Sequence, residues 1–141
     1  MLINAIDSVR NIEFPEIGDE TGALTVMEVG AQVQMEIRRV FVVIAAPGTV
    51  RGRHAHRRCA QIYVCLHGAC RVRVSDGEQE HSFVLNTPRA GLLVPPSIWS
   101  EQTYVEPDTV LMVLCDRPYE ADDYIRDYDA FLAHRAGAVR A

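Results

Sequence analysis

The sequence predicts an all-β fold, an antiparallel barrel or double-sheet jelly roll that ends in a short helix. Short apolar runs rich in β-branched residues follow one another at near-regular spacing from about residue 24 to residue 116. Glycine and proline separate many of these runs, as at Pro47-Gly48, and both residues favour turns. Helical periodicity occurs only over residues 122–133, where apolar residues recur at steps of three and four.

The predicted strands can be taken in order along the chain. They cover residues 24–29, 39–45, 61–66, 70–74, 81–85, 91–94, 98–104 and 109–114. The segment 70–74 alternates apolar and charged residues, which is the pattern of a half-exposed strand. Asp76-Gly77 follows at once and predicts a tight hairpin turn. Many short strands with such turns are typical of a barrel or a jelly roll.

Length and composition indicate one globular domain over residues 1–141. Hydrophobic residues make up 48% and charged residues 23% of the chain, and its net charge is −5. We therefore expect no nucleic-acid partner. No apolar run could span a membrane, and the first residues lack the features of a signal peptide, so we expect a cytoplasmic protein. The four cysteines form no close pair in sequence, which favours buried, reduced thiols.

An arginine cluster lies near the middle of the chain. All 14 basic residues are arginine, and four of them fall within residues 51–58. A guanidinium pairs with phosphate oxygens in a two-pronged fork, so this cluster suits a small ligand that carries phosphate. A solvated basic turn is the alternative interpretation.

Two histidines stand within this cluster. His54 and His56 are separated by Ala55, so both imidazoles point to one face if the segment is extended. On the same alternation, Arg51 and Arg53 face away, and they reach the site only if the chain bends or a neighbouring subunit presents its own site there. The spacing alone leaves open a catalytic pair, a metal-binding pair and two histidines without a role.

The spacing around the histidines resembles the first motif of the cupin superfamily. Gly48 precedes the pair, and Gln61 and Gly68 follow it at the intervals of that motif, with Gln61 in the position of its glutamate. Gly91 and residues 95–97 resemble the turn of the second motif, but Ser100 stands near its histidine. A neutral amide and a hydroxyl are poor substitutes for an anionic carboxylate and an imidazole. We therefore expect no metal and no other cofactor, and we assign the histidines to acid–base chemistry.

Longer segments resemble the WxcM/FdtA-type sugar 3,4-ketoisomerases. They are residues 36–41, 51–56, 91–99 and 123–129, in the order of that family, and the similarity extends from about residue 18 to residue 132. The resemblance implies a cupin jelly roll that works as a homodimer without metal. It implies a dTDP-linked keto-deoxysugar, dTDP-4-keto-6-deoxyglucose, as the substrate and the 3-keto isomer as the product.

The resemblance also implies catalytic roles. Moving a ketone from C4 to C3 requires removal of the C3 proton, formation of an enediol and delivery of a proton to C4. An imidazole can accept and return a proton near neutral pH. His56 corresponds to the usual base, and His54 would orient the sugar or relay the second proton. Arg51 or Arg53 would bind the diphosphate or stabilise the enolate oxygen.

Other residues complete the expected substrate site. Relatives carry a tyrosine near the position of Phe41, so we expect Tyr63 or Tyr104 to supply the missing hydroxyl, unless the histidines work alone. Trp99 is a candidate for contact with the sugar or base, and Glu101 is a candidate active-site acid. Core packing for Trp99 and a solvated strand position for Glu101 are the competing interpretations.

Three other functions fit a cupin of this size. A dTDP-4-keto-6-deoxyglucose 3,5-epimerase also removes a proton next to the ketone, but it uses a His–Asp dyad, and no aspartate is obviously placed for one. A non-catalytic ligand-binding cupin is the second alternative. A metal-dependent dioxygenase is the third, and Gln61 and Ser100 argue against it.

Overall fold

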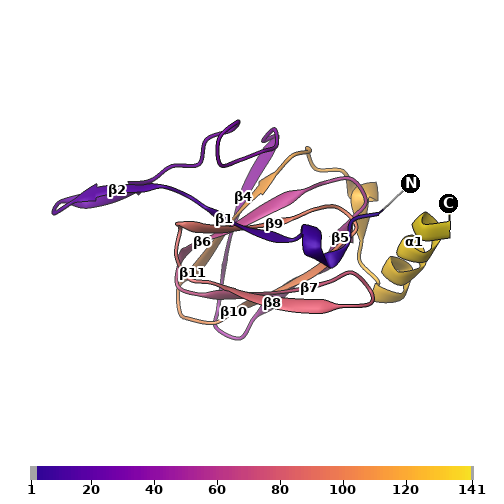
Figure 1. Ribbon diagram of the computed structural model, residues 1–141. Helices are drawn as coiled ribbons and strands as arrows, with labels where there is room; N and C mark the ends of the chain where they lie inside the picture. The colour runs from indigo at the N-terminus through magenta and orange to yellow at the C-terminus, as the bar shows by residue number, and fades with distance from the viewer. Residues whose placement is uncertain (1–2, 141) are drawn as a thin grey trace.

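Two five-stranded antiparallel sheets face each other in the computed structural model, which describes residues 3–140 (Figure 1). The first sheet has the order β1 (Arg10–Glu13), β9 (Ala90–Val94), β6 (Gln61–His67), β11 (Thr109–Cys115) and β4 (Arg39–Ala45). The second has the order β12 (Tyr124–Ile125), β5 (Val50–His56), β10 (Trp99–Tyr104), β7 (Cys70–Ser75) and β8 (Glu80–Leu85). The predicted all-β jelly roll of the cupin type is confirmed.

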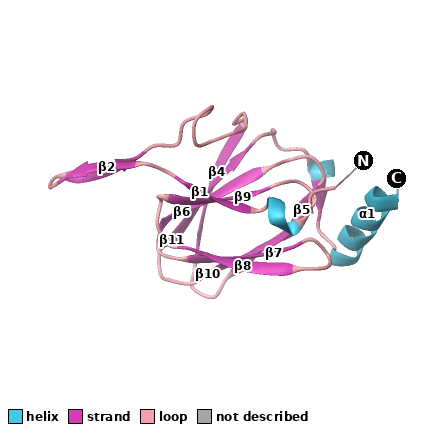
Figure 2. Cartoon of the chain, viewed as in Figure 1, coloured by secondary structure: helices cyan, strands magenta, loops and turns pink. Residues whose placement is uncertain are grey.

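Three further features lie outside the two sheets. The hairpin of β2 (Glu16–Asp19) and β3 (Gly22–Thr25) projects from one end of the body, and helix α1 (Tyr128–Arg140) lies at the other end (Figure 2). Short 3-10 turns cover Ile6–Ser8 and Ala121–Asp123. Among the described residues, no helix is long and apolar enough to cross a membrane.

The core fills the space between the sheets, because alternate residues of each strand point inward. In β7 the inward residues Val72 and Val74 are fully buried, while Arg71 and Arg73 point outward. The predicted Asp76-Gly77 hairpin joins β7 to β8, and Gly77 takes a positive φ of 93° there. All four cysteines are free and buried, as expected.

The C-terminal segment differs from the prediction of a helix over residues 122–133. Tyr124 and Ile125 instead form strand β12, which pairs with His56 and Ala55 of β5. The helix begins only at Tyr128. Backbone pairing with β5 outweighs helical propensity here, and apolar residues of the segment then pack on the outer face of the second sheet. This cluster consists of Ala55, Trp99, Ile125, Tyr128 and Phe131.

Candidate active site

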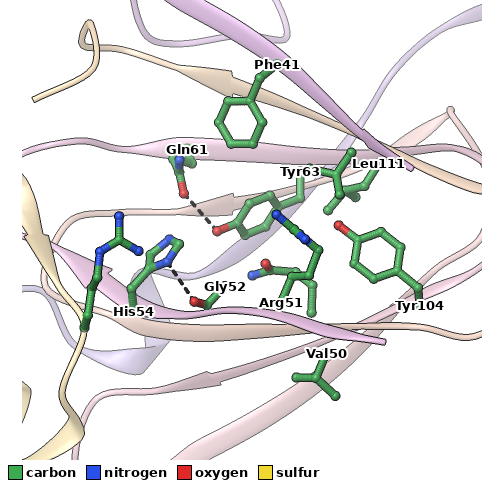
Figure 3. A pocket seen from close by; sticks show the side chains of 12 residues that line it. Phe41, Val50, Arg51, Gly52, His54, Gln61, Tyr63, Tyr104 and Leu111 are labelled. Atoms are coloured by element: carbon green, nitrogen blue, oxygen red, sulfur yellow. Dashed lines mark hydrogen bonds between the residues drawn. The ribbon is translucent and has the colours of Figure 1, made fainter. Parts of the chain in front are cut away.

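A cavity of about 350 Å³ lies between the sheets, and the histidine-bearing strand β5 forms one wall (Figure 3). Apolar side chains of β4 and β11 line one side, including Phe41 and Leu111. The polar side includes His54, Gln61 and Arg51. The cavity therefore combines an apolar wall with a few converging polar groups, as small-molecule sites commonly do.

A bulge in β5 turns Arg51 toward the cavity. Ser100 pairs with His54, but Glu101 pairs with Gly52, so Arg53 has no partner in the ladder. Gly52 and Arg53 both have positive φ values, 84° and 53°. The extra residue interrupts the alternation of the strand. Arg51 lines the cavity as a result, whereas the exposed side chain of Arg53 does not.

His56 forms a buried pair with Asp123. Its Nδ1–H donates to Oδ2 of Asp123 over 2.8 Å, and the backbone N–H of Arg58 donates to the other carboxylate oxygen over 2.6 Å. Because Asp123 occupies Nδ1, the lone pair of a neutral imidazole lies on Nε2, which is buried without any hydrogen-bond partner. Burial lowers the pKa of His56, although Asp123 opposes this effect. The arrangement is that of a general base held in one tautomer.

Sequence reasoning missed Asp123. It lies 67 positions from His56, and the sequence contains nothing near the histidines that marks it. One feature of the sequence could have pointed to Asp123 as a site residue. It begins the segment 123–129, which resembles the ketoisomerases. Asp123 thus supplies the His–Asp pair for which no aspartate is obviously placed in the sequence.

His54 lies beside His56, with ring centroids 5.0 Å apart. Its Nδ1–H donates to the carbonyl oxygen of Gly52 over 3.0 Å, because a carbonyl can only accept (Figure 3). Burial and the neighbouring His56 lower the pKa of His54 to about 4. Both imidazoles are therefore neutral near pH 7, and among the described residues neither Nε2 has a hydrogen-bond partner.

A chain of hydrogen bonds crosses the buried end of the cavity. Gln102 donates to the Ser100 hydroxyl over 3.1 Å, and Ser100 donates to Tyr63 over 3.0 Å. Tyr63 in turn donates to the Gln61 carbonyl over 2.8 Å, and the Gln61 amide donates to the Cys115 sulfur over 3.3 Å. The residues at the two substituted metal-ligand positions, Gln61 and Ser100, thus bind each other through Tyr63.

The side chains at the two substituted ligand positions do not fit a divalent metal ion. Gln61 and Ser100 are neutral and already engaged. Among the residues that the structure describes, one other group could offer ligands, namely His56, Cys59 and Asp123. Both carboxylate oxygens of Asp123 accept hydrogen bonds, and the guanidinium of Arg58 lies 3.7 Å from Oδ1. A cation placed there would meet this positive charge.

The remaining predicted residues divide between the two faces of the second sheet. Tyr104 lines the cavity, and burial raises the pKa of its hydroxyl. Trp99 and Glu101 belong to the opposite face of β10. Trp99 packs against α1 and donates to Glu101 over 2.9 Å, and Glu101 pairs with Arg73. The structure therefore leaves Trp99 and Glu101 outside this cavity.

Tyr124 and two arginines lie next to the histidines, and the sequence had not suggested them. The Tyr124 ring lies 4.4 Å from the ring of His56 and 5.2 Å from that of His54. Arg39 donates to the Tyr124 hydroxyl over 3.3 Å. Arg126 covers the Tyr124 ring at 4.4 Å and also lines the cavity.

Comparison with known proteins identifies the family. Residues 7–136 match the FdtA family, described as WxcM-like, C-terminal. A TDP-4-oxo-6-deoxy-alpha-D-glucose-3,4-oxoisomerase of Aneurinibacillus thermoaerophilus is 39% identical over 121 residues, which are 85% of this chain and 87% of that protein.

Solved structures agree with this assignment. The sugar 3,4-ketoisomerase QdtA of Thermoanaerobacterium thermosaccharolyticum, in complex with TDP, superposes with a TM-score of 0.90 at 30% identity, over 95% of this chain and 98% of that one. A histidine-to-asparagine mutant of QdtA, in complex with TDP-4-keto-6-deoxyglucose, also gives a TM-score of 0.90 at 30% identity, over 94% of this chain and 97% of that one. The chain with the His56–Asp123 pair therefore belongs to the FdtA family of WxcM-like proteins.

Proposed function

We propose that this protein is an isomerase that moves the keto group of dTDP-4-keto-6-deoxyglucose from C4 to C3. The buried His56–Asp123 pair is the observation that carries the proposal, because it supplies a neutral imidazole with an unengaged Nε2 beside His54, which lines the cavity. The names of the relatives supply the substrate and the direction of the shift.

His56 is the base in this proposal. Its Nε2 removes the C3 proton, which the adjacent carbonyl makes acidic, and an enediol forms. Asp123 holds the imidazole in the required tautomer and stabilises the imidazolium that results. A proton is then delivered to C4, either by His56 itself or by the neutral His54, whose ring lies 5.0 Å away. General base catalysis of this kind typically contributes about 10²–10⁴-fold to the rate.

Positive charge at the cavity suits the remaining parts of the substrate. Arg51 and Arg126 both line the cavity. A guanidinium is suited to the diphosphate and to the oxygen on which charge develops in the enediolate. Tyr63 and Tyr104 present hydroxyl groups to the same cavity, and we assign them to sugar binding.

We also propose that the chain acts as a homodimer in the cytoplasm. The outer face of β4 exposes Val40, Val42 and Ile44, with exposed fractions of 51%, 51% and 71%. The projecting hairpin exposes Ile17 and Leu24 to a similar degree. Apolar patches of this kind commonly mark protein interfaces, and a second copy would cover them. The four free thiols are compatible with a reducing compartment.

The 3,5-epimerase reaction is the second candidate, because a His–Asp dyad is the feature that this reaction uses. One experiment separates the two. The protein is incubated with dTDP-4-keto-6-deoxyglucose in D2O, and the sugar is followed by NMR. We expect deuterium at C3 and a 3-keto species. Deuterium at C5 would support the epimerase instead, and absence of exchange at both carbons would contradict both reactions and favour a ligand-binding cupin.

A further inference from the structure

Arg58 follows the strand that carries the two histidines and lies against the carboxylate that orients His56. We infer that Arg58 is a positioning residue: its guanidinium holds the buried Asp123 in the charged form, so that the His56–Asp123 pair takes up no proton near neutral pH. The effect of Arg58 on turnover rests on the proposed function, whereas its effect on the imidazole does not.

The backbone after β5 wraps around Asp123. The strand ends at His56, and the N–H of Arg57 then donates to the backbone carbonyl of Asp123 over 2.8 Å. The N–H of Arg58 donates to the Asp123 side chain, at Oδ1, over 2.6 Å. These two bonds bring the Arg58 side chain to the 3-10 turn Ala121–Asp123. The same stretch of backbone therefore positions both the carboxylate and the guanidinium.

The Arg58 guanidinium lies close to three carboxylates. Its Nε is 3.7 Å from Oδ1 of Asp123, and its Nη2 is 3.0 Å from Asp122 and 3.8 Å from Glu120. The Asp122 side chain is 82% exposed, so water screens that contact and it contributes little. The Asp123 side chain is only 3% exposed. The charge of Arg58 therefore acts mainly on Asp123, because a buried carboxylate has little water to stabilise it.

A buried carboxylate beside a neutral imidazole needs a positive charge nearby. Burial lowers the pKa of His56, so the imidazole carries no charge near pH 7 and does not neutralise Asp123. Among the residues that the structure describes, Arg58 is the one arginine within salt-bridge distance of this carboxylate. Without that charge, burial would favour uptake of a proton by the pair. An imidazolium would then form, and His56 could no longer accept the proton of the sugar.

Other titratable and charged groups also face the pair. Besides burial, the charges of Arg39 and Arg126 lower the pKa of His56, and both of these arginines contact the Tyr124 ring or hydroxyl. The full set around the pair consists of His54 on β5, Cys59 just after it, Arg39 on β4, Tyr124 on β12, Arg126 after it, and Arg117, Glu120 and Asp122 before it. All of these groups remain when Arg58 alone is replaced, so a change in the pKa of His56 reports the charge of Arg58.

Loss of the Arg58 charge should act in one direction. A positive charge disfavours a proton on either member of the His56–Asp123 pair, so a neutral residue at position 58 should raise the pKa of His56. The Arg58 side chain is 38% exposed and water screens part of its charge, so we expect a rise of about 0.5–1 pH unit. The base would then stay protonated, and inactive, up to a higher pH.

The test compares Arg58→Met, which removes the charge, with Arg58→Lys, which keeps it. Arg57→Met is the matched control, because the neighbouring side chain is exposed and contacts His134. Nitrogen-15 NMR of the imidazoles at a series of pH values gives the tautomer and the pKa of His56 without any substrate, and the signals of His56 are those absent from His56→Asn. The pH profile of kcat/KM for C3 exchange then measures the same group during turnover.

We expect the pKa of His56 and the acidic limb of the kcat/KM profile to move to higher pH by about 0.5–1 pH unit in Arg58→Met. KM should change little, because Arg58 is not among the residues that line the cavity. Arg58→Lys and Arg57→Met should both behave like the unmodified protein. Arg58→Gln repeats the test should Arg58→Met fold poorly.

Other results would decide against the inference or separate it from the proposed function. An unchanged pKa of His56 in Arg58→Met overturns the role of Arg58, as does an equal rise in Arg58→Lys or in Arg57→Met. A keto shift whose pH profile is the same in all variants supports the proposed function and overturns the role of Arg58. A raised pKa of His56 in a protein that catalyses no keto shift supports the role of Arg58 and contradicts the proposed function.

Discussion

The imidazole of His56 and the carboxylate of Asp123 join two distant parts of the chain, with Nδ1 and Oδ2 2.8 Å apart. His56 ends the strand β5, and Asp123 ends the 3-10 turn that leads into β12. Because β12 pairs directly with β5, the backbone that positions the acid is in register with the backbone that positions the base. Both side chains are almost completely buried, so water does not compete for this contact.

Replacing Asp123 with Asn should reduce kcat by about 10²–10⁴-fold, because an amide no longer selects the tautomer or stabilises the imidazolium. Steady-state kinetics with the 4-keto sugar nucleotide measures the effect. Asp122→Asn is the matched control, since the neighbouring carboxylate is exposed and pairs only with Arg58 in the described structure. Equal activities of the two variants would contradict a role for Asp123.

Replacing His56 with Asn should abolish C3 exchange, with a loss of about 10²–10⁴-fold, while binding of the nucleotide is largely retained. NMR exchange rates and calorimetric binding of TDP separate the two effects. The exposed His81 in β8 offers the control variant His81→Asn. Activity of His56→Asn close to that of the unmodified protein would remove His56 from the role of base.

The half-buried His54 makes stability depend on pH. His54 has a pKa near 4 in the folded protein and about 6.5 when unfolded, so the unfolded chain binds more protons between these values. The free energy of unfolding should therefore fall as pH drops from about 6.5 to about 4, through the contribution of this residue. Denaturant titrations across this range should show that the free energy of unfolding depends less steeply on pH in His54→Gln than in the unmodified protein. An unchanged slope would contradict the lowered pKa of His54.

Treatment with a chelator should leave activity intact. The groups at the two substituted ligand positions, Gln61 and Ser100, are neutral and hydrogen-bonded through Tyr63, so they offer a metal ion neither the negative charge of a carboxylate nor the nitrogen of an imidazole. Activity before and after incubation with EDTA, followed by dialysis, measures this. Loss of activity that zinc or iron restores would show that a metal participates.

Gly52 should tolerate a side chain poorly. Its φ is +84°, and a Cβ built there would lie 2.5 Å from the side-chain amide oxygen of Gln102, so the buried Gln102 side chain would have to move. Gly48 has nearly the same φ, +83°, but no atom within 4 Å of such a Cβ. Gly48→Ala should therefore cost only the backbone strain, about 1–2 kcal/mol, and Gly52→Ala should cost more and also disturb the cavity. Thermal unfolding and kinetics of both variants test this difference.

Most strands of the two sheets and the histidine pair could be predicted because they depend on local patterns, whereas the predicted strand 24–29 is wrong, since β3 ends at Thr25. Alternation places His54 and His56 toward one side, and in the structure their ring centroids lie 5.0 Å apart, with Ala55 between them packed on the opposite face. The same alternation also separates Ser100 and Tyr104, which face inward, from Trp99 and Glu101, so the last two could have been excluded from the cavity at the outset.

Other parts of the site depend on long-range structure that no local pattern encodes. The direction of Arg51 follows from a bulge, which arises from the register between β5 and β10. The position of Asp123 follows from the docking of β12 on β5. The apolar periodicity of residues 122–133 predicts a helix there, so the sequence does not indicate this strand. Packing of Ile125 and Phe131 against Trp99 stabilises the docked arrangement, and this contact exists only in the folded chain.

The attachment of β12 to β5 has a consequence for biosynthesis. His56 is translated well before Asp123, the residue that orients it, and strands β6 to β11 lie between them. A nascent chain can form its barrel on the ribosome, yet it lacks the dyad until residues 121–125 emerge and dock. The His56–Asp123 pair is therefore complete only after β12 has docked on β5, and products truncated before Asp123 should be inactive even if their barrels folded.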